Sequence, residues 1–118
     1  MKFVLQINSS PYHSSASLTA YRFAVDVLVQ NHEIYRIFFY HDGIYHAFKS
    51  ANPPEDEISI FNYWTELSLK HNLDLVVCIS AAQRRGLLPD NVAAGFRLGG
   101  LGQLIDATIL ADRFLVFG

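Results

Sequence analysis

The chain has 118 residues, of which 51% are hydrophobic and 17% are charged, and its formal net charge at pH 7 is −2. This length and balance predict one packed domain over residues 1–118, and the scattered basic residues lack the stripe that marks a nucleic-acid binder. The single cysteine excludes an internal disulfide. The first residues turn polar too early for a signal peptide, and no apolar run could span a bilayer, so we expect a cytoplasmic protein without membrane contact.

The first third of the chain predicts a strand, a helix and a second strand. Residues 3–7 form a short apolar run, and the serine-rich turn that follows ends it. Residues 17–30 are amphipathic at helical spacing, with an apolar stripe made by Leu18, Tyr21, Val25 and Leu28. Residues 33–40 are β-branched and aromatic, which favours a strand, and His41-Asp42-Gly43 breaks it.

The middle of the chain predicts a long loop and then a helix. Residues 44–54 lose their periodicity and end in Asn52-Pro53-Pro54, so we expect the longest loop there. The acidic run at 55–57 precedes an apolar helical stripe made by Ile60, Trp64 and Leu67. Because negative charge is favourable near a helix N-terminus, the run predicts a helix start. His41 and His46 match no metal-ligand spacing and are expected to be solvated loop side chains.

The second half predicts a buried strand, a helix and a terminal strand. The strand is expected over residues 74–79, of which 75–79 are an apolar run, and the segment that begins at Ser80 is helix-like. The glycine run at 99–102 lacks a phosphate-binding fingerprint, so it indicates close helix–sheet packing. A last helix follows, with a stripe made by Leu104, Ile105, Thr108 and Ile109, and residues 114–117 form a strand. Alternating strands and helices predict an α/β fold, a three-layer sandwich with a mostly parallel central sheet.

Cys78 is the candidate functional residue because it lies where the third predicted strand gives way to a helix. Ligands and chemistry collect at the carboxyl edge of an open α/β sheet, and a helix N-terminus favours a thiolate. A free cysteine also packs well as a small buried hydrophobe. Arg84 and Arg85 could stabilise a thiolate or dock an anionic partner, or they could form a solvated helix face.

The ordered segments resemble the DsrE/TusD family of sulfurtransferase subunits, which are small α/β proteins of sulfur-relay complexes with a flavodoxin-like, DsrE-like fold. The resemblance rests on residues 1–3, 11–12, 37–43, 77–86, 95–103 and 111–113. Relatives carry a longer segment between Arg84-Arg85-Gly86 and Gly95-Phe96, so this chain has either a shorter loop or a missing mobile piece there.

The resemblance implies that Cys78 is a persulfide carrier that takes sulfur from a donor protein and gives it to an acceptor cysteine. It implies no metal, nucleotide or flavin cofactor. It also implies a heterohexamer with paralogous DsrE-like subunits, and small donor and acceptor proteins with reactive cysteines. The expected pathway is 2-thiouridine synthesis at the tRNA wobble position. The alternatives are dissimilatory sulfur oxidation with the same chemistry, and a non-catalytic scaffold subunit.

Overall fold

The structure is a computed structural model that describes residues 1–11, 15–49 and 60–118. Five strands form one sheet in the order β4-β3-β2-β1-β5, and every neighbouring pair is parallel. The strands are β1 (Lys2–Ile7), β2 (Glu33–Phe39), β3 (Leu75–Cys78), β4 (Phe96–Gly99) and β5 (Arg113–Phe117). The predicted α/β class and parallel sheet are confirmed.

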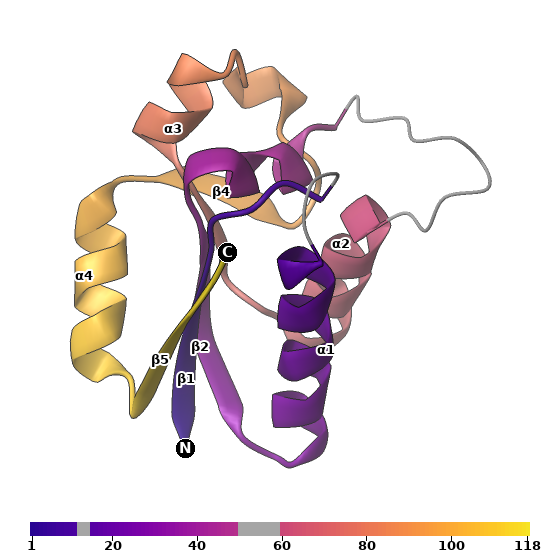
Figure 1. The fold of residues 1–118 in the computed structure, drawn as a ribbon, viewed down its shortest axis with the longest axis vertical. Coiled ribbons are helices and arrows are strands. Elements are labelled where there is room, and N and C mark those ends of the chain that lie inside the picture. The colour runs from indigo at the N-terminus through magenta and orange to yellow at the C-terminus, as the bar shows by residue number, and fades with distance from the viewer. Residues whose placement is uncertain (12–14, 50–59) are drawn as a thin grey trace.

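The helices cover both faces of this sheet (Figure 1). One face carries α1 (Ala16–Val29) and α2 (Ile60–His71), and the other carries α4 (Leu101–Leu110). The first four strands advance in one direction across the sheet, whereas β5 lies on the far side of β1. Because parallel crossovers are right-handed, the reversed connection through α4 lies on the opposite face. In the part of the chain described, no helix is both long and apolar enough to cross a membrane.

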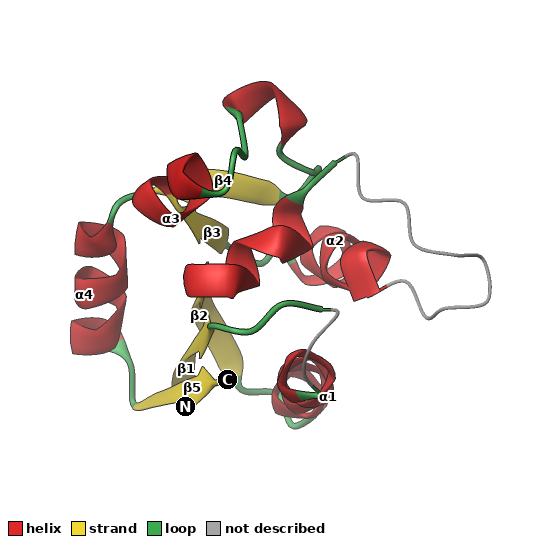
Figure 2. Ribbon diagram, turned by 45° about the horizontal axis from the view of Figure 1, so that its top comes forward, coloured by secondary structure: helices red, strands yellow, loops and turns green. Residues whose placement is uncertain are grey.

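Short elements gather where the strands end. The helix α3 (Ile79–Arg84) follows β3 directly, and two 3-10 helices, η1 (His41–Ala47) and η2 (Pro89–Asn91), lie at the same end of the sheet. This end comes forward in Figure 2. The carboxyl edge of the sheet is therefore built from loops and short helices, the usual place for chemistry in such folds.

The expected loop over residues 44–54 is wrong for its first part. Residues 44–47 belong to η1, in which Gly43, Ile44, His46 and Ala47 are buried. A Cβ on Gly43 would overlap the carbonyl oxygen of Ile7, so only glycine lets η1 sit against the end of β1. An apolar segment that lacks helical or strand periodicity is usually interpreted as a loop, but such side chains can also pack a tight helical turn against the core. Residues 50–54 and the acidic run at 55–57 lie outside the described residues.

Strand β4 was not predicted from the sequence. It has four residues and lies between Gly95, whose φ is +92°, and Gly100. So short a run gives no periodic signal, and its glycine neighbours favour a loop. Pairing with β3 along its whole length makes it a strand.

Candidate active site at Cys78

Cys78 is the last residue of β3 and the N-cap of α3. Its backbone is extended, with φ −62° and ψ 120°, and it pairs in register with Gly99 of β4. The expected strand-end position is therefore present. The side chain is only 1% exposed, so the thiol meets solvent or a partner only after a local movement. Burial of this kind also fits a cysteine that serves as a small core residue.

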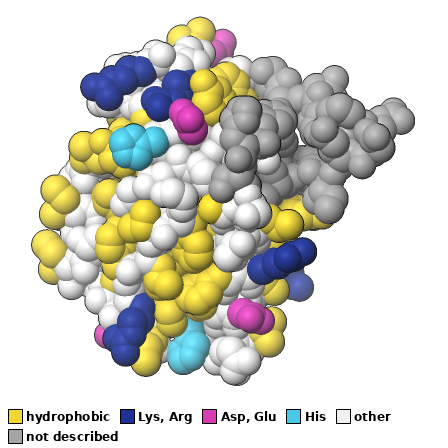
Figure 3. Space-filling view, viewed as in Figure 1, with side chains coloured by type: hydrophobic (Ala, Val, Ile, Leu, Met, Phe, Trp, Pro, Cys, Tyr) yellow, Lys and Arg dark blue, Asp and Glu magenta, His cyan; other side chains and the backbone are white. Residues whose placement is uncertain are grey.

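The 3-10 helix η1 packs against both elements that meet at Cys78, namely β3 and α3. An ion pair closes this contact, because the Arg85 Nε donates to Asp42 Oδ1 at 2.9 Å. The Arg85 Nη1 also donates to the Ala81 carbonyl oxygen at 3.2 Å. Figure 3 shows basic, acidic and histidine side chains together at the top of the molecule, over α3 and η1. Arg85 thus links the end of α3 to η1.

The two arginines lie at the far end of α3 from the thiol. Arg84 is the last residue of the helix and Arg85 is its C-cap, so about 9 Å of helix axis separates them from Cys78. At physiological ionic strength that is about one Debye length, which weakens a direct effect on the thiolate. Arg84 is exposed, and no hydrogen bond or ion pair of its side chain is found within the described ranges. Arg84 can therefore meet a partner, whereas Arg85 is engaged with Asp42.

Sequence reasoning missed Asp42 as part of this site. It lies 43 residues before Arg85, and a lone aspartate beside a turn glycine carries no signal for such a distant partner. Only the docking of η1 on α3 brings the two side chains together.

The expectation of solvated loop histidines is wrong for His46 and correct for His41. His46 is fully buried, its Nε2 lies 3.2 Å from the Ser9 carbonyl oxygen, and its ring lies 5.5 Å from that of Phe39. Burial lowers the pKa of His46 to about 4, although the Ser9 bond opposes this, so the ring is neutral at pH 7. His41 is exposed and stacks on Tyr40 at 4.0 Å.

A charged network fixes the opposite end of β3. Asp74 accepts hydrogen bonds from Arg36 Nε at 2.7 Å and from Arg97 Nε and Nη2 at 2.7 and 2.9 Å. Burial by itself raises the pKa of Asp74, but the bonds from Arg97 and Arg36 outweigh it and lower that pKa. The network joins β2, the start of β3 and β4, and so holds the strand whose other end carries Cys78.

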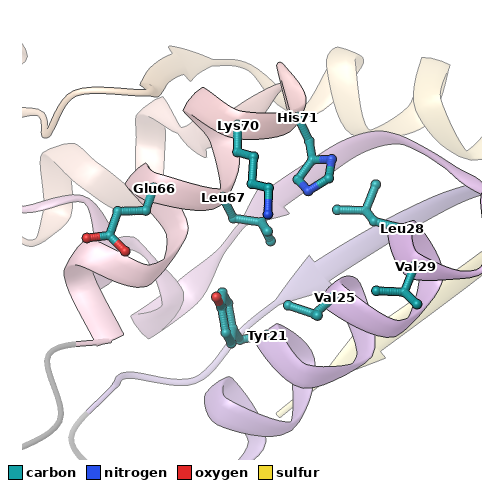
Figure 4. A pocket seen from close by; sticks show the side chains of 8 residues that line it. All are labelled: Tyr21, Val25, Leu28, Val29, Glu66, Leu67, Lys70 and His71. Atoms are coloured by element: carbon teal, nitrogen blue, oxygen red, sulfur yellow. The ribbon is translucent and has the colours of Figure 1, made fainter.

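A groove of about 360 Å³ lies between α1 and α2. Figure 4 shows the eight side chains that line it, namely Tyr21, Val25, Leu28, Val29, Glu66, Leu67, Lys70 and His71. Except for Tyr21, these residues lie in the second half of their helix. Because both helices run against the strands, this places the groove toward the amino ends of the strands and away from Cys78. Burial, with the nearby Glu66 and Tyr63, raises the pKa of Tyr21, so its hydroxyl keeps its proton. The groove is separate from the candidate active site.

Comparison with known proteins places this geometry in a family. The chain is 47% identical over 129 aligned positions to DsrE of Allochromatium vinosum, with 100% of this chain and 99% of the relative covered. Those positions exceed the 118 residues of this chain, so the relative has residues without a counterpart here. A sulfurtransferase TusD homolog of Aliivibrio fischeri is 38% identical, with 96% of this chain and 95% of the relative covered.

Solved structures agree with the sequence comparison. The ychN protein from E. coli superposes with a TM-score of 0.86 at 26% identity, covering 99% of both chains. A protein of unknown function from Methanobacterium thermoautotrophicum shares the fold, with a TM-score of 0.69 at 15% identity and 97% of both chains covered. The DsrE/DsrF-like family model matches residues 1–117. The chain therefore belongs to the DsrE/DsrF-like family.

Proposed function

We propose that this protein is a sulfurtransferase that carries sulfur as a persulfide on Cys78. The observation that carries the proposal is the placement of the only cysteine at the carboxyl end of a central parallel strand, in a chain whose relatives include proteins named sulfurtransferases. A thiol is the side chain that can accept and release a sulfur atom by exchange.

The reaction is two successive thiolate exchanges. In the first, the Cys78 thiolate attacks the outer sulfur of a donor persulfide, R–S–SH. A sulfur–sulfur bond forms at Cys78, the donor bond breaks, and the donor leaves as the thiolate R–S⁻. In the second, an acceptor thiolate attacks the outer sulfur of the Cys78 persulfide and displaces the Cys78 thiolate. One sulfur atom moves in each step, and the exchange needs no external oxidant or reductant.

The burial of Cys78 adds one requirement, which is that η1 and α3 separate before either exchange. The thiol is 1% exposed, and the Asp42–Arg85 pair joins the two elements beside it. Arg84 is exposed on the same short helix, so it serves to dock an acidic surface of the donor or acceptor. Arg85 contributes through its ion pair with Asp42 on η1.

The proposed pathway is the sulfur relay for 2-thiouridine at the tRNA wobble position, with paralogous subunits in a heterohexamer and without direct contact between this chain and RNA. The names of the TusD relatives support sulfur transfer. The second candidate is dissimilatory sulfur oxidation, favoured by the 47% identity to DsrE of Allochromatium vinosum. Both use the same persulfide chemistry at Cys78. Thiolated tRNA in a deletion strain, measured by mass spectrometry of nucleosides, separates them.

A scaffold role without chemistry is the third candidate, favoured by the burial of the thiol. Mass spectrometry of the intact protein after incubation with a persulfide donor decides this point. We expect one added sulfur on the wild type and none on Cys78→Ser, with the far-UV circular dichroism unchanged. A native protein that takes up no sulfur would favour the scaffold, and a serine variant that still takes it up would remove Cys78 from the mechanism.

A further inference from the structure

Gly99 lies beside Cys78 and leaves room there for a polar side chain from α4. Gly99 and Cys78 pair in register on adjacent strands, so a side chain at either position points to the same face of the sheet. A Cβ on Gly99 would lie 2.7 Å from Val76 Cγ1 and 2.9 Å from Gln103 Nε2. The space beside Cys78 that a side chain of residue 99 would occupy is therefore filled by the Gln103 amide and by Val76.

The Cys78 side chain points to the face of the sheet that α4 covers (Figure 1). The Phe39 ring lies 5.7 Å from that of Trp64 on α2, so Phe39 points to the α2 face, and Val77 is its register partner. Because side chains alternate along a strand, Cys78 points to the opposite face. Gln103 belongs to α4. Its amide and the thiol therefore lie on the same face of the sheet.

Hydrogen bonds hold the backbone of Gln103 but leave its side chain unused. The Gln103 N–H donates to the Gly100 carbonyl oxygen at 3.1 Å, and the Gln103 carbonyl oxygen accepts a bond from Arg36 Nη1 at 2.8 Å. Arg36 also donates to Asp74, so the charged network at the start of β3 extends to the first turn of α4. Among the described residues, neither end of the half-buried Gln103 amide has a hydrogen-bond partner.

We propose that Gln103 holds the outer sulfur of the Cys78 persulfide through a hydrogen bond from Nε2. This inference rests on the proposed function of Cys78. In the part of the chain that the structure describes, no hydrogen bond joins the amide to the thiol itself. With adjacent strands about 5 Å apart, Nε2 lies within about 8 Å of the Cys78 Cβ. The outer sulfur of a persulfide lies about 2 Å beyond Sγ, so the loaded side chain reaches the amide where the free thiol does not.

The outer sulfur needs a donor because the surroundings of Cys78 on this face are apolar. Val76 and Phe38 are register partners on the same face, and both are fully buried. A deprotonated persulfide carries its negative charge on the outer sulfur, and a buried charge is costly unless it is hydrogen-bonded. The Gln103 amide supplies the donor from the β4 side. The loaded state is thereby stabilised relative to the free thiol, which gains nothing from the amide.

Equilibration with glutathione persulfide and glutathione tests the proposal, with intact-protein mass spectrometry as the readout. The measured quantity is the ratio of persulfide to glutathione at which half of the protein carries one added sulfur. Gln103→Met keeps the length of the side chain and removes the donor, so we expect it to raise this ratio about tenfold, the lower end for a hydrogen bond to a charged group. Gln103→Glu keeps the shape of glutamine and brings a negative charge to the outer sulfur, so it should raise the ratio at least as much.

Two controls separate a bond to the sulfur from a structural role of Gln103. Gln6→Met is the matched variant, because Gln6 is a half-buried glutamine on β1, two strands away from β3, and it should leave the ratio unchanged. The second control is the rate at which iodoacetamide alkylates the unloaded thiol. A loosened α4 would expose Cys78 and raise that rate, whereas we expect Gln103→Met to alkylate at the wild-type rate.

The outcomes distinguish this inference from the proposed function. Loading of Gln103→Met at the wild-type ratio, an equal shift in Gln6→Met, or a shift accompanied by faster alkylation of the unloaded thiol would each overturn the role of Gln103 and leave the persulfide on Cys78 in place. A wild type that takes up no sulfur would instead overturn the proposed function, and the role of Gln103 with it.

Discussion

The Asp42–Arg85 ion pair makes a prediction about how fast Cys78 reacts. If the pair holds η1 against α3 over the buried thiol, removing either partner should increase the fraction of molecules in which the thiol is accessible. Arg85 is 23% and Asp42 is 56% exposed, so the pair is partly exposed to solvent and contributes about 0.5–1 kcal/mol. This free energy corresponds to an opening equilibrium about 2 to 5 times larger in Arg85→Ala and in Asp42→Ala.

The measurement is the rate at which a small alkylating reagent modifies the native protein, with Arg84→Ala as the matched control. Arg84→Ala removes the same charge one residue away without breaking the pair, so its rate should stay near that of the wild type. Raising the salt to 1 M should bring the wild-type rate toward that of the variants, because the Debye length falls to about 3 Å.

The alternative is that the arginine charge tunes the thiolate through its field, and it predicts opposite signs for the two variants. Arg85→Ala would then slow alkylation and Asp42→Ala would speed it. That result, or unchanged rates in both variants, would refute the role of the pair in covering Cys78.

Two further predictions concern stability. His46 has a folded-state pKa of about 4, below its ordinary value of 6.5, so between these pH values the unfolded chain binds more protons than the folded one and the free energy of unfolding decreases as the pH falls. Urea unfolding should show a loss of about 2 kcal/mol between pH 7 and pH 5. A His46→Asn variant with the same loss would contradict the assignment of this pH dependence to His46. Gly43→Ala would press a methyl group into the Ile7 carbonyl oxygen and should lower the free energy of unfolding by about 2–3 kcal/mol. Gly102→Ala is the control, because a methyl group there meets no atom within 4 Å, and it should leave the free energy of unfolding unchanged or raise it. Equal effects of the two substitutions in urea titrations would show that the contact at Gly43 is not tight.

The sequence by itself determined the class of fold and the position of the candidate residue. The apolar runs before the first serine-rich turn and before Cys78 are strands because continuous apolar segments are buried on both faces of a parallel sheet. The amphipathic helix expected over residues 17–30 is α1, which differs by one residue at each end. Local pattern sufficed for these elements because their burial and their hydrogen bonds depend on period and length.

Only the tertiary structure decided what surrounds Cys78. Strand β4 exists because it pairs with β3, and His46 is buried because η1 folds onto the ends of the strands. The partner of Arg85 comes from a segment 43 residues away. On α4, Ala107 is buried while Ile105 and Ile109 are exposed, and this depends on which side of the helix reaches the sheet. These features are contacts between segments far apart in the sequence, and the local sequence of one segment gives no signal that identifies the other. A local pattern therefore placed the thiol at the end of a strand, whereas the elements that bury it depend on the tertiary packing of η1 and α3 around it.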